Sequence, residues 1–318
     1  MEVPFVSLFF ACCKNVKKPT IDIPSMVSSI LHGDRKLLAR AITMVENDLP
    51  GSEGLLKQLR HGKASVLGFT GPPGAGKSTL INAFLRFLIA HDKKAAVVAV
   101  DPTSPFNFGS LLADRLRMSE HFNNDNIFIR SIATRGSLGG LSEKIIEITD
   151  VLRAADFDYI VVETVGVGQS EVEISGLADT TVVVVVPESG DEIQAMKSGI
   201  MEIADVFVVN KSDREGAEML QNSIKKMQPL KSTWIAPVIQ TIATNGTGMD
   251  ELFEKIALHR KSEGFNEKKI FLLTEKAYQL IRSYKMKEIQ RKDIREKLEK
   301  VAKDTSFNLY AFVDQYKD

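Results

Sequence analysis

The stretch that most constrains the fold of this chain is the glycine-rich motif at residues 71–78, which reads Gly-Pro-Pro-Gly-Ala-Gly-Lys-Ser. Apolar residues from Val66 lead into it, and a helical pattern of apolar residues follows from Leu80 to Leu88. This order of strand, glycine loop and helix is the context of a phosphate-binding P-loop. Its glycines let backbone N–H groups turn towards an anion, and the start of the helix adds its positive dipole end. An ordinary glycine-rich turn accounts poorly for all three parts, so we predict a nucleotide-binding protein.

Each polar residue of the motif has an expected task. Lys77 can reach the β- and γ-phosphates, and the Ser78 hydroxyl is placed to bind Mg²⁺. The residues of this stretch that we predict to bind the nucleotide are Gly71, Pro72, Pro73, Gly74, Ala75, Gly76, Lys77, Ser78 and Thr79.

Composition excludes several classes of partner. The 318 residues include 41 Lys plus Arg and 41 Asp plus Glu, so no net field favours nucleic acid or an anionic membrane as a partner. The two cysteines are adjacent, Cys12 and Cys13, and cannot form a disulfide framework, which favours a cytoplasmic location. Residues 4–13 are apolar but too short to span a bilayer. We expect residues 1–22 to be a disordered tail, and regard a signal peptide or a lipid-modified cysteine as a less favoured alternative.

Alternating strand and helix patterns predict the fold class. Strands are expected at residues 66–70, 94–101, 126–130, 157–163, 180–186, 204–213 and 234–241. Such alternation indicates an α/β protein with a doubly wound, mainly parallel sheet and ligand loops at the carboxyl ends of the strands. We divide the chain into N-terminal helices at 23–64, a P-loop nucleotide-binding domain at 65–261 and a C-terminal helical extension at 262–318.

A second motif predicts which base is bound. Asn210-Lys211-Ser-Asp213 closes a hydrophobic strand downstream of the P-loop. The Asp213 carboxylate can accept hydrogen bonds from guanine N1–H and the 2-amino group, whereas adenine offers no such pair. The loop after the next strand, Ile242, Ala243 and Thr244, is expected to complete the base site, with the Ala243 amide donating to guanine O6.

Two carboxylates follow strands near the predicted phosphate site. Glu163 begins the sequence Glu-Thr-Val-Gly166, where the carboxylate can hold the water shell of Mg²⁺ and Gly166 can donate its N–H to the γ-phosphate. Asp101 ends another strand and is a second candidate near the metal, although a helix cap or turn former would have the same residue type.

Several motifs together resemble one family. They lie, in family order, at residues 71–79, 101–106, 114–118, 135–140, 163–169, 190–205 and 210–213. In these stretches the chain resembles the MeaB/ArgK family of SIMIBI-class P-loop GTPases, which includes the human methylmalonic aciduria type A protein.

The resemblance implies a Mg²⁺-dependent GTPase that binds GTP and GDP, with weak ATP hydrolysis beside it. It implies a chaperone that gates cofactor loading and protects an adenosylcobalamin-dependent acyl-CoA mutase, chiefly methylmalonyl-CoA mutase. It also implies a homodimer formed through the C-terminal helices. The catalytic residues implied are Lys77, Glu163, Gly166, Gln169 and Lys197, and the metal residues are Ser78, Asp101, Asp114 and Glu163. Residues 190–197 correspond to a third switch that reports the nucleotide state to the mutase.

The chain departs from the family pattern at Phe108, Ala113, Glu188 and Ile242, and the first three replace glycines in or beside the switches. Two other functions stay open. A small-molecule or protein kinase, or an ATPase, of the lysine/arginine/ornithine transport type would use the same P-loop, but Asp213 argues against ATP. A nickel-delivering GTPase would need a metal cluster, and the five scattered histidines form none in the sequence.

Overall fold

The computed structural model describes residues 22–60, 62–101, 118–133, 144–164, 173–188, 200–228, 234–286, 289, 291–301 and 309–316. The chain forms two compact units, Met1–Phe265 and Asn266–Asp318.

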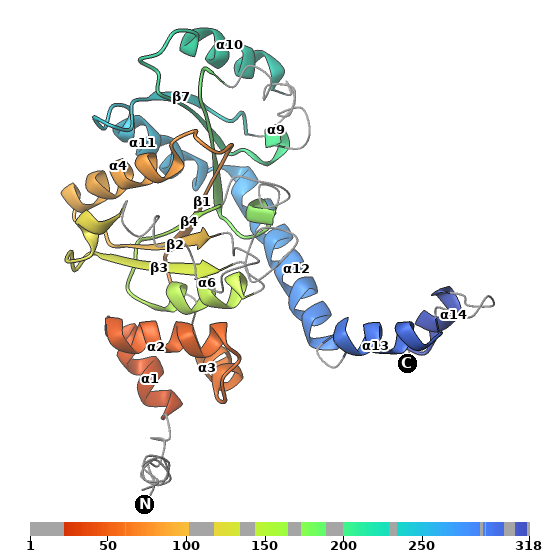
Figure 1. The fold of residues 1–318 in the computed structure, drawn as a ribbon. Coiled ribbons are helices and arrows are strands. Elements are labelled where there is room, and N and C mark those ends of the chain that lie inside the picture. Colours follow the sequence, from red (N-terminus) through yellow and green to blue (C-terminus); the bar gives the residue numbers. More distant parts are fainter. Residues whose placement is uncertain are drawn as a thin grey trace, which may run out of the picture. The chain divides into compact units, whose positions relative to one another are not determined.

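The first unit is built on a parallel sheet in the order β3-β2-β4-β1-β5-β6-β7 (Figure 1). Its strands are β1 Ser65–Thr70, β2 Ala95–Asp101, β3 Ile127–Ala133, β4 Tyr159–Glu163, β5 Thr180–Val185, β6 Val206–Asn210 and β7 Val238–Thr241. Each neighbouring pair is parallel, so all carboxyl ends meet at one edge. The central strands are rich in valine and buried on both faces, as expected for a parallel sheet covered by helices. The predicted doubly wound fold is confirmed.

Helices cover both faces of this sheet (Figure 1). They are α1 Ile23–Leu31, α2 Arg35–Glu46, α3 Ser52–Gln58, α4 Lys77–Ala90, α6 Ile145–Ala154, α9 Ile200–Ile203, α10 Ala217–Met227 and α11 Met249–His259, with the 3₁₀ turns η1 Ser119–His121 and η2 Ile174–Gly176. The short α9 precedes β6 along the chain.

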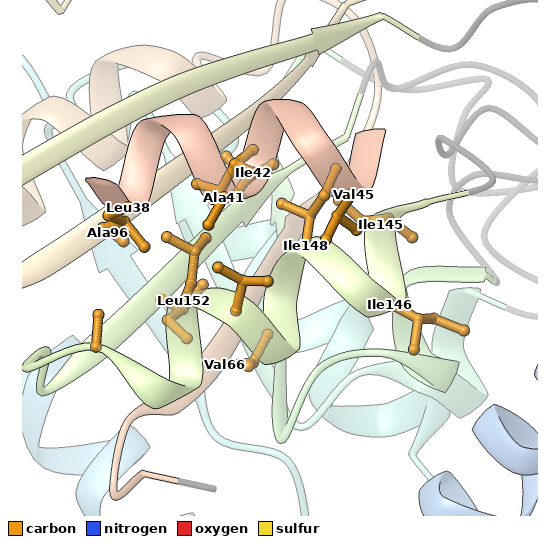
Figure 2. Packing of buried hydrophobic residues seen from close by; sticks show 14 of the residues in the cluster. Leu38, Ala41, Ile42, Val45, Val66, Ala96, Ile145, Ile146, Ile148 and Leu152 are labelled. Atoms are coloured by element: carbon orange, nitrogen blue, oxygen red, sulfur yellow. The ribbon is translucent and has the colours of Figure 1, made fainter. Parts of the chain in front are cut away.

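Alternate residues of each strand face opposite helical layers. Val66 and Ala96 join the cluster that contains α1, α2, α3 and α6, and Figure 2 shows α2 packed on α6 there. Leu67 and Phe69, on the other side of β1, pack with α4 and α11. The N-terminal helices thus share a hydrophobic core with the sheet. Helix α10 covers β5, β6 and β7 in a third cluster.

The second unit is helical in the residues described. Helix α12, Glu263–Lys285, runs into it, and α13, Arg291–Val301, and α14, Leu309–Asp314, follow. In the described parts of the chain, no helix combines the length and apolar character that crossing a membrane requires.

Several predicted strand boundaries were wrong. Strand β3 continues beyond residue 130 to Ala133, because β2 pairs with it along its whole length. Strand β6 occupies only Val206–Asn210 of the predicted 204–213. Strand β7 begins at Val238 rather than 234, directly after Pro237, which has no N–H to give to a ladder.

Candidate nucleotide-binding site

The loop between β1 and α4 has a backbone that only glycine fits at two points. Gly71 has φ +138°, and a Cβ there would lie 2.0 Å from the carbonyl oxygen of Val184. Gly76 has φ +84°, and its Cβ would lie 2.5 Å from Nδ2 of Asn210. Both φ values belong to the region that residues with a Cβ avoid. The glycines therefore permit the turn and also bring it close to the neighbouring strands.

Lys77 begins α4 and its side chain bends back over the loop. It is buried, and its ammonium donates to the carbonyl oxygens of Gly71 at 2.7 Å and Pro72 at 3.1 Å. This places a positive charge inside the loop, at the end of the helix where the dipole is also positive. A bound phosphate would meet both.

Ser78 and Glu163 connect the P-loop helix to the end of β4. The Ser78 hydroxyl donates to Glu163 Oε1 at 2.7 Å, and both side chains are buried. Beside them the Thr164 hydroxyl donates to Thr70 Oγ1 at 3.0 Å. A hydroxyl and a carboxylate in contact supply the hard oxygen ligands that Mg²⁺ prefers, so this pair fits the implied metal.

Asn210 joins the two halves of the site. Its Nδ2 donates to the carbonyl oxygen of Ala75 at 2.9 Å. Its Oδ1 accepts from the Ala243 amide and from the Thr241 hydroxyl, each at 3.2 Å. The side chain is 2% exposed. One amide thus ties the P-loop to the loop after β7.

The turn that follows Asn210 presents the residues predicted to read the base. Lys211 has φ +54°, and its carbonyl oxygen accepts from the Arg214 amide at 3.0 Å. The Ser212 amide donates to the carbonyl oxygen of Thr241 at 3.1 Å, which fixes the turn to β7. Asp213 lies exposed on this turn.

The loop after β7 is also held by its own backbone. The Ile242 amide donates to Thr247 at 3.2 Å. Thr244 is exposed, whereas Ala243 is buried. The Ala243 amide, predicted to contact guanine O6, already donates to Asn210, so a base would share this donor.

The structure thus places the P-loop residues, Glu163, the Asn210 turn and the loop after β7 at one edge of the sheet. Asp101 ends β2, but its side chain lies outside the described residues. Asp114, Gly166, Gln169 and Lys197 also lie outside them, as do the departures Phe108 and Ala113.

Sequence reasoning missed the polar residues that support the site, namely Thr70, Thr164 and Thr241. Each directly precedes or follows a residue of a motif or ends a strand, and that position was the only available signal.

The fold and the site define a P-loop nucleotide-binding protein. A family model described as methylmalonyl Co-A mutase-associated GTPase MeaB matches residues 38–298. The chain therefore belongs to the MeaB family, and it is a GTPase.

Relatives and a solved structure agree with this assignment. A protein described as a GTPase in Pyrococcus horikoshii is 47% identical over 247 residues, which cover 75% of this chain and 78% of that one. GTPase ArgK of Escherichia coli is 36% identical, covering 72% and 73%. The mouse methylmalonic aciduria type A homolog is 34% identical, covering 73% and 61%. A crystal structure titled LAO/AO transport system kinase superposes with a TM-score of 0.65 at 25% identity, covering 92% and 96%.

Proposed function

We propose that this GTPase binds guanine nucleotide with Mg²⁺ and acts as a regulatory chaperone of an adenosylcobalamin-dependent acyl-CoA mutase, such as methylmalonyl-CoA mutase. It would gate the loading of the cofactor and protect the mutase. The observation that carries the nucleotide part is Asn210, which bonds the P-loop at Ala75 and the base loop at Ala243. A cytoplasmic location, suggested by the adjacent cysteines, belongs to this proposal.

Guanine selectivity rests on the exposed turn. Asp213 would accept from N1–H and the 2-amino group, and Lys211 and the loop of Ile242, Ala243 and Thr244 would frame the base. Adenine would leave the carboxylate without a donor, which disfavours ATP.

The phosphate half of the site would use the residues of the P-loop. The ammonium of Lys77 would exchange its carbonyl partners for phosphate oxygens and stabilise the charge that develops on them. Ser78 and Glu163 would hold Mg²⁺, with Asp101 and Asp114 as further candidates at this edge. When bound, Mg²⁺ neutralises phosphate charge. Gly166 and Gln169 remain proposed participants in hydrolysis, and Lys197 is a proposed participant only in the faster hydrolysis that the bound mutase stimulates.

The partner is proposed from the family. Its description names a methylmalonyl-CoA mutase, and one relative is named for methylmalonic aciduria. The third switch, residues 190–197, would report the nucleotide state to that mutase. Neither a membrane nor nucleic acid is part of this proposal.

We also propose a homodimer formed through the C-terminal helices. On α12, five exposed apolar residues have spacings of 3, 7, 1 and 3 positions, which places them along one face of the helix. They are Ile270, Leu273, Leu280, Ile281 and Tyr284. Such a stripe on one helix is what a partner helix covers.

The alternative function is a kinase of the lysine/arginine/ornithine transport type, because the solved structure with a similar fold carries that title. It would need ATP as the phosphate donor. The turn that carries Asp213, proposed to recognise guanine, favours the GTPase function over the kinase function.

Nucleotide preference tests the first part of the proposal. Asp213→Asn replaces an acceptor by an amide that presents N–H groups to the donors of guanine. We expect GTP binding to weaken by about 2 kcal/mol or more, roughly 30-fold, in titration calorimetry. The wild type should bind GTP far more tightly than ATP, and equal affinities for the two would exclude guanine reading.

Coupling to a mutase tests the second part. We expect slow hydrolysis by the GTPase alone and faster hydrolysis when methylmalonyl-CoA mutase is added, since a partner that prefers one switch state shifts its population. Substituting Asp191 and Lys197 with alanine should keep the unstimulated rate near that of the wild type and remove the stimulation. If the stimulation survives both substitutions, residues 190–197 are not the relay.

A further inference from the structure

Glu188 and Arg214 form an ion pair between two loops at the nucleotide edge of the sheet. Glu188 lies three residues after the end of β5, and Arg214 lies four residues after the end of β6. An Nη1 N–H of Arg214 donates to Glu188 Oε1, and both side chains are about half exposed. Beside this pair, a Cβ on Gly216 would lie 3.8 Å from Cβ of Pro187, so the two loops are also close in their backbones.

Two positive and two negative side chains interact electrostatically at these loops. The hydrogen bond from Arg214 is the main reason that the pKa of Glu188 is below its ordinary value, so this carboxylate stays ionised at neutral pH. The charge of Lys211 also lowers the pKa of the Glu188 carboxyl. The hydrogen bond to Glu188 raises the pKa of the Arg214 guanidinium, and the charge of Asp213 also raises it. Arg214 therefore has two carboxylates within its influence, and Glu188 is the one to which it is bonded.

We infer that Glu188 is a positioning residue for base recognition, because it holds the Arg214 guanidinium away from the Asp213 carboxylate. Arg214 belongs to the same turn as Asp213, and its amide closes that turn on Lys211. Without Glu188, the guanidinium would be drawn to Asp213, where its N–H groups would compete with those of guanine. This inference rests on the proposed role of Asp213 in base recognition. It adds Glu188 as a residue that keeps the Asp213 carboxylate free of Arg214 and available to guanine.

The inference predicts an unusual pattern in three variants. Glu188→Gln should weaken GDP binding by about fivefold, the range expected when an exposed charge pair is rearranged. Arg214→Gln should bind within about twofold of the wild type, because it removes the competitor. The double variant Glu188→Gln/Arg214→Gln should recover the wild-type affinity. Fluorescent GDP titrations of the full-length protein at low and high salt would measure this, and the effect of Glu188→Gln should shrink as salt increases.

A matched control is Glu215→Gln, which removes the same charge from an exposed position one residue after Arg214 and should not change GDP affinity. A latch that merely holds the two loops together predicts another pattern, in which both single variants weaken binding equally and the double variant does not recover. That pattern, or an unchanged affinity in Glu188→Gln, would overturn the inference.

A second set of variants, made in the Asp213→Asn background, tests this inference separately from the proposed guanine recognition. In Asp213→Asn, xanthosine diphosphate should replace GDP as the preferred ligand, because xanthine carries an oxygen where guanine has its amino group. Adding Glu188→Gln to this background should then cause no further loss, since no carboxylate remains for Arg214 to approach. Failure of the switch to xanthine would refute the guanine-reading role of Asp213. A normal switch with a further loss from Glu188→Gln would overturn only the role assigned to Glu188.

Discussion

At the scale of single residues, His121 illustrates how burial sets the protonation of a side chain far from any motif. It ends η1 and is 3% exposed, with Nε2 3.4 Å from Glu120 Oε1. Burial lowers its pKa below 6.5; Arg86 also lowers it, whereas Glu120 and the backbone of Asn82 oppose this change. The folded protein therefore keeps His121 neutral where the unfolded chain would bind a proton.

This difference predicts a pH dependence of stability. Because the folded pKa is the lower one, the contribution of His121 is complete above pH 6.5 and is lost as the pH falls towards the folded pKa. We expect this residue to lower the free energy of unfolding as the pH falls below 6.5. In His121→Gln the decrease should be smaller than in the wild type, measured by urea unfolding at a series of pH values. Equal decreases in the two proteins would contradict the assignment.

The site residues that could be predicted from the sequence are those whose residue type and position in a motif indicate their chemical role. Lys77, Ser78 and Glu163 stand at the ends of readable elements, and parallel strands bring their carboxyl ends to one edge. The contact between Asn210 and Ala75 could not be predicted in this way, because it joins residues 135 positions apart. The same holds for the Glu188–Arg214 pair: Glu188 was noted only as a departure from the family, and the partner became visible once β5 was placed beside β6.

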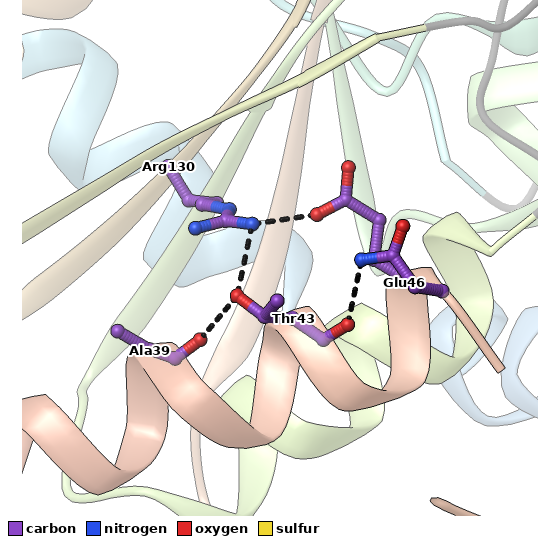
Figure 3. A network of polar contacts seen from close by, with 5 residues as sticks. Ala39, Thr43, Glu46 and Arg130 are labelled. Carbon is purple, nitrogen blue, oxygen red and sulfur yellow. Dashed lines mark hydrogen bonds and ion pairs between the residues drawn. The ribbon is translucent and has the colours of Figure 1, made fainter. Parts of the chain in front are cut away.

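At the scale of elements, α2 is fastened to the edge strand β3 by a polar contact as well as by its apolar face. Arg130 on β3 donates to Glu46 at 2.6 Å and to the Thr43 hydroxyl at 3.3 Å (Figure 3). The Thr43 hydroxyl in turn donates to the carbonyl oxygen of Ala39 at 3.0 Å. The side chains of Arg130 and Glu46 are 23% and 12% exposed, so the pair is partly removed from water.

Replacing Arg130 should therefore destabilise the N-terminal layer. In Arg130→Met the partly buried carboxylate of Glu46 loses a charged donor, and we expect the free energy of unfolding to fall by about 1–3 kcal/mol. Lys57→Met is the control, since its pair with Glu53 on α3 is about three-quarters exposed and should change stability by less than about 0.5 kcal/mol. Denaturant unfolding would compare the two. A loss in Arg130→Met no larger than in the control would show that the apolar face alone holds α2.

The sequence also predicted elements better than their ends. Runs of valine and isoleucine identify the buried strands, because such residues suit a covered parallel sheet. The length of a strand depends on its neighbour, which is why β3 extends to Ala133 alongside β2. That partner is set by the order of strands in the sheet and is absent from local composition.

At the scale of the whole molecule, the exposed stripe of α12 predicts the oligomeric state. Ile281→Glu with Tyr284→Glu places two charges within the stripe, where side chains are 61% and 74% exposed. We expect the wild type to be a dimer and the double variant to be a monomer, because the free-energy cost of burying an unpaired carboxylate exceeds the stabilisation from the apolar contact. Light scattering after gel filtration would measure the two masses. Lys285→Glu, the adjacent charged position, should leave the dimer intact. A monomeric wild type, or an intact dimer in the double variant, would refute the proposed interface.

The bonds of Asn210 have a consequence for how the nucleotide leaves. Because one buried amide is bonded to the loop that would hold the phosphates and to the loop that would hold the base, neither loop can move far without breaking a bond that the other needs. Affinity for the two ends of the nucleotide is then coupled, and the coupling is reciprocal. An exchange factor would consequently need to contact only one of these loops. Displacing that loop from the nucleotide would weaken the binding of both the phosphates and the base.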